Sequence, residues 1–269
     1  MAARVELPAD RPHVALVTID RPAQANSLDP PTLRELAAAW RRLAADDAVR
    51  CVVLTGAGDR VFCAGMDMKT TIPLSQRFAR GERIDPDDFE GLRSVRTALL
   101  AGFDLGKPLV CAVNGHARAG GFDLMLAAEI RYAVPHATFA LEEVALGLYP
   151  TGNATVLLPR QIGWVHAHEL LLTARPIDAR RAAEIGLVNR LVDRDALLAT
   201  ALDTASAIAA NAPLAVRETR RGIRELLPLS LPDAYRRQEE LGAPLRKTDD
   251  AREAQRAFVE KRRPVFRGR

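Results

Sequence analysis

The stretch N-G-H-A-R-A-G-G-F-D-L, residues 114–124, joins an apolar run to a helical pattern. The run before it, L-V-C-A-V at 109–113, predicts a buried strand, and apolar residues at helical spacing over 122–130 predict a helix. A strand that passes through glycines into a helix aims backbone N–H groups at the space above the turn. Such a turn stabilises negative charge on a phosphate or on a carbonyl oxygen during a reaction.

Taken alone, this stretch leaves two interpretations open. It contains neither the G-x-G-x-x-G of dinucleotide-binding folds nor the G-K-[ST] of phosphate-binding loops, and a glycine turn can serve packing alone. A second stretch repeats the same order of features. V-V-L-T at 52–55 predicts a strand, G-A-G-D at 56–59 a turn, and V-F-C-A-G-M-D at 61–67 a loop of small residues.

The two stretches together resemble the enoyl-CoA hydratase/isomerase (crotonase) superfamily. The matching segments are L-T-G-A-G-D-R-V-F-C-A-G-M-D at 54–67, K-P-L-V-C-A-V-N-G at 107–115, A-G-G-F-D-L at 119–124, F-A-L-E-E-V-A-L-G-L-Y-P at 139–150 and R-P-I-D-A-R-R-A-A-E-I-G-L-V-N-R-L-V at 175–192. The run F-D-L-M-L-A-A-E at 122–129 is similar to the branch that includes carnitinyl-CoA dehydratase. The resemblance implies an α/β fold, a crotonase-like spiral of repeated ββα units with a C-terminal α-helical oligomerisation region.

The sequence pattern changes near residue 194. Residues 1–193 are expected to form the spiral core with the acyl-CoA site, with strands at 4–7, 14–19 and 50–55 and a helix that buries Trp40. Residues 70–88 hold prolines and a glycine without a sustained period and are predicted to be a mobile surface excursion. In residues 194–269, helices are predicted at 197–210, 213–227, 232–241 and 249–262, and the resemblance implies that they assemble a homotrimer or hexamer.

Composition narrows the classes of partner. The 269 residues carry a formal net charge of only +4, and the basic residues, mostly Arg, alternate with acidic ones, which indicates a solvated surface without a nucleic-acid stripe. Cys51, Cys63 and Cys111 lack C-x-x-C spacing and predict buried, reduced thiols in a cytoplasmic protein. The N-terminus shows no signal-peptide pattern and no apolar run approaches the ~20 residues of a membrane span, so no membrane association is expected.

The resemblance implies an oxyanion hole built from two backbone amides. Carried over residue by residue, the donors are the N–H groups of Ala64, in the C-A-G-x-D loop, and of Gly120, in the glycine turn. The turn has Ala119 where the family has a third glycine, which keeps the chain position but restricts the backbone. Two such amides stabilise the enolate of an acyl thioester, and losing one typically costs ~10²–10³ in rate.

The family's hydratases use two glutamates, which correspond here to Glu143 and to Asp123. Glu143 matches the pattern and is the expected acid/base. Asp123 is a departure, because its carboxylate reaches roughly 1.5 Å less than that of a glutamate. The backbone can compensate, a water can bridge the gap, or Asp123 can have lost its part in proton transfer and remain as an acid at a helix start. Glu142 and Arg118 also replace residues usual in the family, and an ion pair is expected for Arg118.

The resemblance also implies where coenzyme A lies. The expected contacts are Ala25, Ser27, Ala64, Gly65, Met66, Asp67, Met68, Lys69 and Gly120. No metal site is predicted, and no cofactor is expected beyond the coenzyme A that forms part of the substrate.

The leading hypothesis is an enoyl-CoA hydratase-type lyase that adds water reversibly to an α,β-unsaturated acyl-CoA through a stabilised enolate. One alternative is a Δ3-Δ2-enoyl-CoA isomerase, which needs one strong acid/base. Another is a non-catalytic acyl-CoA binder of the same fold, which the shortened acid at Asp123 motivates.

Overall fold

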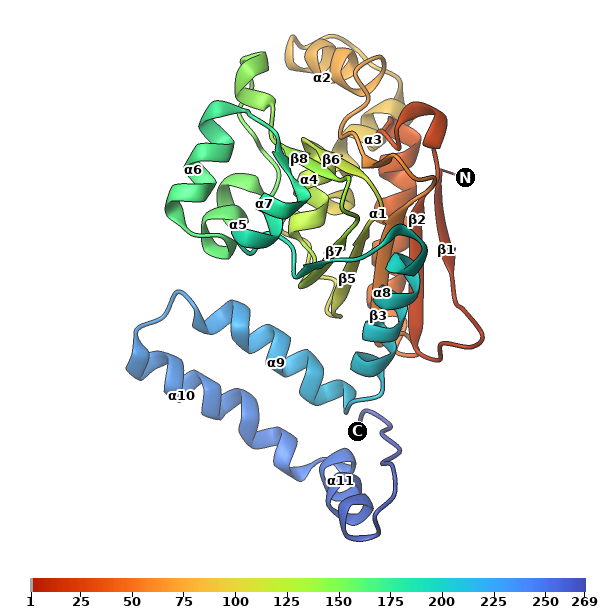
Figure 1. Ribbon diagram of the computed structural model, residues 1–269, viewed down its shortest axis with the longest axis vertical. Helices are drawn as coiled ribbons and strands as arrows, with labels where there is room; N and C mark the ends of the chain where they lie inside the picture. The colour runs from red at the N-terminus through yellow and green to blue at the C-terminus, as the bar shows by residue number, and fades with distance from the viewer. Residues whose placement is uncertain (1) are drawn as a thin grey trace.

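The computed structural model describes residues 2–269, and Figure 1 shows a two-sheet core from which C-terminal helices extend. The larger sheet has six strands in the order β1-β2-β3-β5-β7-β10. Its strands are β1 (Ala3–Glu6), β2 (Val14–Ile19), β3 (Cys51–Gly56), β5 (Leu109–Val113), β7 (Ile130–Ala133) and β10 (Arg190–Leu191). The β1–β2 pair is antiparallel and the other pairs are parallel, and the strands predicted at 4–7, 14–19, 50–55 and 109–113 are confirmed.

The smaller sheet has four short strands in the order β4-β6-β8-β9. They are β4 (Val61–Cys63), β6 (His116–Arg118), β8 (Thr138–Ala140) and β9 (Ile177–Asp178). Successive strands along the chain alternate between the sheets: β3 then β4, β5 then β6, β7 then β8. This alternation is the predicted spiral of ββα units. The sequence did not predict β6, which lies inside the glycine-rich stretch that was expected to be a continuous turn.

Helices cover and fill this spiral. They are α1 (Pro30–Ala45), α2 (Thr71–Ala79), α3 (Pro86–Ala98), α4 (Gly120–Leu126), α5 (Ala154–Gln161), α6 (Trp164–Thr173), α7 (Ala179–Glu184) and α8 (Arg194–Ala209), with the 3-10 turns η1 (Pro22–Gln24) and η2 (Glu143–Leu146). Every residue of α4 is buried, and Trp40 of α1 is fully buried with its indole N–H donating to the Ala98 carbonyl. Burial raises the thiol pKa of Cys51 and Cys63 to about 12, and Cys111 is likewise buried and free, as predicted for the thiols.

The expectation of an irregular excursion over 70–88 is wrong for most of that segment. Residues 71–79 form α2, and α3 begins at Pro86, where the Asp85 side chain accepts from the Asp87 amide and proline occupies the first turn. Thr71 and Leu74 of α2 are buried, and the Phe78 ring packs at a tilt against Phe89 of α3 with ring centroids 5.4 Å apart. Tertiary packing thus stabilises helices whose own sequence has no clear period.

The C-terminal helices are α9 (Pro213–Leu226), α10 (Leu231–Gly242) and α11 (Asp249–Val259), with the 3-10 turn η3 (Ala243–Lys247) before α11. All four helices predicted after residue 194 are confirmed, and in Figure 1 α9, α10 and α11 project away from the sheets. In contrast, α8 packs on the large sheet through Leu197, Ala201 and Ala205. The division of the chain at residue 194 stays a prediction, and the packing of α8 favours a boundary between α8 and α9.

Among residues 2–269, none of the helices combines the length and the apolar composition that a bilayer crossing requires.

Candidate active site

The two glycine-bearing stretches singled out in the sequence lie against each other. A Cβ atom built on Gly65 would lie 2.9 Å from the Gly120 nitrogen, and one built on Gly120 would lie 3.7 Å from the Met66 nitrogen. Gly65 has a φ of +87°, a left-handed conformation that a side chain disfavours. The backbone of the 61–67 loop therefore touches the start of α4, as the proposed site requires.

The amide donors differ in part from the expectation. The Ala64 N–H donates to the Ala25 carbonyl at 3.1 Å, so it is already satisfied within the protein. Leu28 pairs with this loop as in a parallel sheet, donating to the Gly65 carbonyl at 2.8 Å and accepting from the Asp67 amide at 3.1 Å. In that pattern the N–H of the intervening Met66 points away from Leu28. Within residues 2–269, the Met66 amide has no hydrogen-bond acceptor, which makes Met66 rather than Ala64 the available donor.

Gly120 occupies the first position of α4, where helix amides have no acceptor within their own helix. Ala119, the N-cap, has φ 44° and ψ −121°, a combination that glycine adopts readily and other residues rarely. Its amide donates to the Ala140 carbonyl at 3.0 Å, so β8 holds the turn in this strained form. The Gly120 amide thus remains as the second donor beside Met66.

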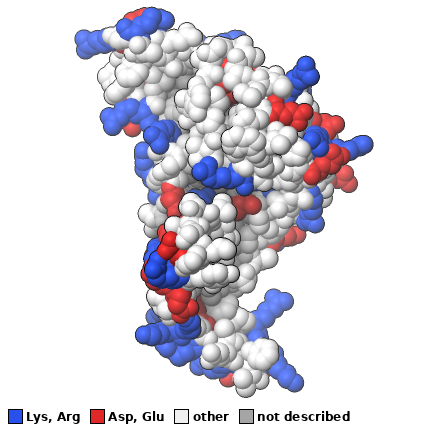
Figure 2. All heavy atoms as spheres, turned by 90° about the vertical axis from the view of Figure 1, so that its left-hand side faces the viewer, with Lys and Arg blue, Asp and Glu red and all other residues white. Residues whose placement is uncertain are grey.

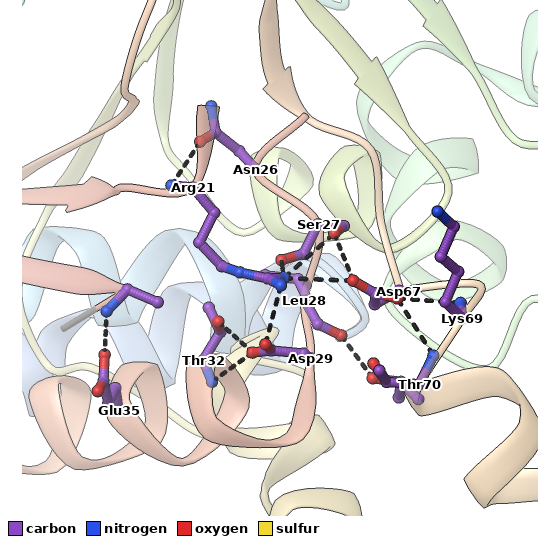
Figure 3. A network of polar contacts seen from close by, with 12 residues as sticks. Arg21, Asn26, Ser27, Leu28, Asp29, Thr32, Glu35, Asp67, Lys69 and Thr70 are labelled. Carbon is purple, nitrogen blue, oxygen red and sulfur yellow. Dashed lines mark hydrogen bonds and ion pairs between the residues drawn. The ribbon is translucent and has the colours of Figure 1, made fainter. Parts of the chain in front are cut away.

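A polar network fixes the loop that the sequence assigned to coenzyme A (Figure 3). The Ser27 hydroxyl donates to Asp67 Oδ2 at 2.9 Å, and Arg21 lies 3.4 Å from the same oxygen. Asp67 Oδ1 accepts from the Lys69 amide at 2.9 Å. Burial would raise the pKa of Asp67, but hydrogen bonds from Ser27 and the Lys69 amide lower it below its ordinary value. The Ser27 and Asp67 side chains therefore shape the loop, while Met68 and Lys69 are exposed.

Asp123, on α4, is almost fully buried. Its Oδ1 accepts from the amides of Asn153 at 2.6 Å and Ala154 at 2.7 Å, at the start of α5. Burial, to which the charge of Glu143 adds, raises the pKa of Asp123 to about 7, although these two amides lower it. The two carboxylates expected from the sequence are therefore neighbours, and Asp123 can exist in either protonation state near neutral pH.

Glu143 begins η2, and its Oε2 is buried without a hydrogen-bond partner among residues 2–269. Burial raises its pKa above the ordinary value, and the charge of Glu142 adds to this effect. An unpartnered buried carboxylate oxygen costs free energy that packing must offset, and such groups are common where a protein handles protons. Glu142 itself pairs with Arg118 at 3.0 Å, which confirms the structural ion pair predicted for Arg118.

Sequence reasoning missed the residues that hold Asp123. Asn153 has its side chain buried between α3, α4 and α5, and a Cβ built on Gly152 would lie 2.2 Å from Asp123 Oδ2. The one signal in the sequence is that a glycine and an asparagine, a residue type favoured at helix starts, directly precede α5. Which carboxylate they serve is visible only in the folded chain.

Turns from two ββα units bring together two backbone amides that have no acceptor among residues 2–269, beside two neighbouring carboxylates. This arrangement defines a crotonase-type protein. The sequence model of the enoyl-CoA hydratase/isomerase family matches residues 10–269. The enoyl-CoA hydratase EchA19 of Mycobacterium tuberculosis is 41% identical over 265 residues, 96% of this chain and 95% of that protein. A carnitinyl-CoA dehydratase of Proteus mirabilis is 35% identical over 263 residues, 96% of this chain and 97% of that protein.

Solved structures agree with these relatives. The crystal structure of an enoyl-CoA hydratase from Bacillus anthracis matches with a TM-score of 0.89 and 33% identity, covering 100% of both chains. The chain belongs to the enoyl-CoA hydratase/isomerase family, and its function is of the enoyl-CoA hydratase type.

Proposed function

We propose that this protein adds water reversibly across the double bond of an α,β-unsaturated acyl-CoA, using the amides of Met66 and Gly120 and the carboxylates of Asp123 and Glu143. The observation that carries the proposal is that these two amides, from separate turns in contact, have no acceptor among residues 2–269. The unpartnered Oε2 of Glu143 and the raised pKa of Asp123 accompany them.

The amides bind the thioester oxygen. When water attacks the β-carbon, the electrons of the C=C bond pass toward this oxygen and form an enolate. Fixed backbone donors stabilise that charge without reorganising during the reaction, which is why their effect is large. Met66 replaces Ala64 in this role because the Ala64 amide is already bonded to Ala25.

The carboxylates move the protons. In the proposed reaction Glu143 is the principal acid/base: it takes a proton from the attacking water and returns one to the α-carbon. Asp123, held by the Asn153 and Ala154 amides, positions the water or shares the proton. A carboxylic acid with a raised pKa suits this role, because its protonation state changes near the pH of the reaction.

A Δ3-Δ2-enoyl-CoA isomerase is the second candidate, and one observation favours it. Asp123 Oδ1 accepts two amide hydrogen bonds and Oδ2 lies against Gly152, whereas Glu143 keeps an unpartnered oxygen. A site in which only Glu143 transfers protons would suffice for moving a double bond.

Kinetics on crotonyl-CoA and on a 3-enoyl-CoA test both candidates. The wild type is expected to hydrate crotonyl-CoA. Glu143→Gln is expected to lower kcat about 10²- to 10⁴-fold, the usual contribution of general acid–base catalysis. Glu142→Gln, which changes the paired neighbour instead, is the matched control and should retain most activity. Isomerisation of the 3-enoyl-CoA without hydration of crotonyl-CoA would establish the second candidate. Binding of both substrates in calorimetry without turnover of either would identify the protein as a non-catalytic acyl-CoA binder.

The remaining assignments complete the proposal. The loops 25–28 and 65–69 are proposed to contact coenzyme A, and the reaction needs no cofactor beyond that part of the substrate. A homotrimer or hexamer is proposed as the assembly, because C-terminal helices that project from the core expose apolar side chains. A cytoplasmic location is proposed from the buried, free cysteines.

A further inference from the structure

Asn153 contacts Asp123 through both its backbone and its side chain. It is buried, with 5% of its surface exposed. Its backbone N–H donates to Asp123 Oδ1 at 2.6 Å, and its side-chain Nδ2 donates to the Asp123 carbonyl at 2.9 Å. The same Nδ2 donates to the Leu99 carbonyl at 2.8 Å, at the end of α3. One residue therefore contacts both the carboxyl group and the backbone of Asp123.

The side-chain amide suits this position because its NH₂ group carries two protons, one for each carbonyl. Removing it would take this donor away from the carbonyls of Leu99 and Asp123 in a buried place, and a buried acceptor that loses its donor costs roughly 1–3 kcal/mol. Asp123 has little other freedom, since Gly152 lies against its Oδ2 and the Ala154 amide binds Oδ1. The position of the carboxylate is thus determined by the segment 152–154.

We infer that Asn153 is a positioning residue for the proposed hydration. It holds the short carboxylate of Asp123 at one place beside Glu143 and ties that place to the end of α3. The inference rests on the proposed function, and it explains how an aspartate can serve where a glutamate would reach further. The aspartate side chain is shorter than that of a glutamate, and hydrogen bonds from the start of α5 fix where its carboxylate lies.

Asn153→Ala tests the inference, with Gln161→Ala as its matched control. Gln161 also lies on α5 and also donates its side-chain amide to a carbonyl of α4, that of Leu126 at 3.0 Å, but among residues 2–269 it makes no hydrogen bond with Asp123. Asn153→Ala is expected to lower kcat on crotonyl-CoA about tenfold, with KM changed by less than about twofold. Gln161→Ala is expected to lower thermal stability while kcat stays near the wild-type value.

The pH profile separates positioning from a general loss of stability. Glu143 is the charged group that acts on Asp123. A carboxyl group released from its burial becomes better solvated, so the limb of the kcat profile that belongs to Asp123 should move to lower pH in Asn153→Ala. Asn153→Ser keeps one donor and should give a smaller loss with a shift in the same direction. It also serves as the test if the alanine variant does not fold.

A double-mutant cycle gives the deciding result. In an Asp123→Asn background, Asn153→Ala should cost less than about twofold in kcat, because the group it positions is already changed. An equal loss in both backgrounds, or equal losses for Asn153→Ala and Gln161→Ala, would overturn the inference. If the wild type hydrates no 2-enoyl-CoA, the proposed function fails instead, so the two failures are distinguishable.

Discussion

Asp123 is the residue at which the proposed catalytic role and stability oppose each other. Burial and the charge of Glu143 raise its pKa from 3.8 to about 7. The folded protein therefore binds this proton more tightly than the unfolded chain does. The contribution to stability is fully present below the unfolded pKa and is lost as pH rises toward the folded pKa. A pKa difference of this size corresponds to on the order of 4 kcal/mol.

Asp123→Asn should for this reason stabilise the protein at pH 8 while lowering hydratase activity. Asparagine keeps an oxygen for the Asn153 and Ala154 amides and carries no charge at any pH. Urea unfolding at pH 8 and at pH 5 is the measurement, and the stability gained should be larger at pH 8. Asp10→Asn, at an exposed side chain, is the control and should show no such difference. A gain that does not depend on pH would contradict the raised pKa.

Ala119 is a second residue whose substitution should increase stability. Its φ of 44° with ψ of −121° is costly for any residue with a Cβ, by about 1–3 kcal/mol. Ala119→Gly should remove that strain and, after the greater entropy lost on folding, raise the free energy of unfolding by about 1 kcal/mol. Thermal unfolding measures it. Ala117→Gly, at a buried strand position in β6, should be destabilising, and a loss in both variants would show that Ala119 is not strained.

At the scale of elements, α9 is held to the core mainly by charge. Arg220 is 8% exposed, and it contacts Glu129 at 2.8 Å and Asp104 at 2.7 Å. Arg224 also reaches Glu129 at 2.9 Å, and the second oxygen of Glu129 accepts from the Leu109 amide in β5. The network therefore connects α9 directly to the large sheet.

Arg220→Met should loosen α9 from the core, because it removes the buried guanidinium that bridges Glu129 and Asp104 and leaves the more exposed Arg224 to contact them. The expected loss in unfolding free energy is roughly 1–3 kcal/mol. Limited proteolysis should cleave the variant faster at residues 210–213, between α8 and α9. Arg217→Met removes an exposed pair with Glu218 and should change little. Equal cleavage of both variants would mean that the network does not hold α9.

At the scale of the molecule, two regions each carry several exposed apolar side chains. Figure 2 shows the side of the molecule that carries α6, where a broad area is free of charged side chains. Three residues of α6, Trp164, Val165 and Leu172, have exposed side chains. On the C-terminal helices, Ile223 and Leu227 are each 68% exposed and lie one helical turn apart. Exposed apolar surface of this extent is typical of protein–protein contact.

Leu227→Asp should weaken the proposed assembly, because it places a charge in an apolar contact at the C-terminal helices. Light scattering after size exclusion is expected to give a trimer or hexamer for the wild type and smaller species for the variant. Leu7→Asp, at an exposed leucine near the β1 edge, should leave the assembly intact. A wild-type monomer would contradict the proposed assembly.

The sequence by itself determined the spiral class and the C-terminal helices, and it supplied the two carboxylates proposed for the site. Strand periodicity, glycine turns and the motif at Glu143 are local signals, so they can be read without the fold. Local signals failed at α2, whose helix depends on packing of Leu74 and Phe78. They also left open what the shorter acid at Asp123 does.

Only the tertiary structure decided which atoms are available for chemistry. The Ala64 amide donates to the Ala25 carbonyl, whereas the amide of Met66, whose neighbours Gly65 and Asp67 pair with Leu28, points away from Leu28 and has no acceptor among residues 2–269. In the same way, the partners of Asp123 come from Asn153 and Ala154, a different turn of the spiral. Sequence specifies the residue types near a site. Whether an amide or carboxylate is satisfied depends on segments that meet only when the chain folds.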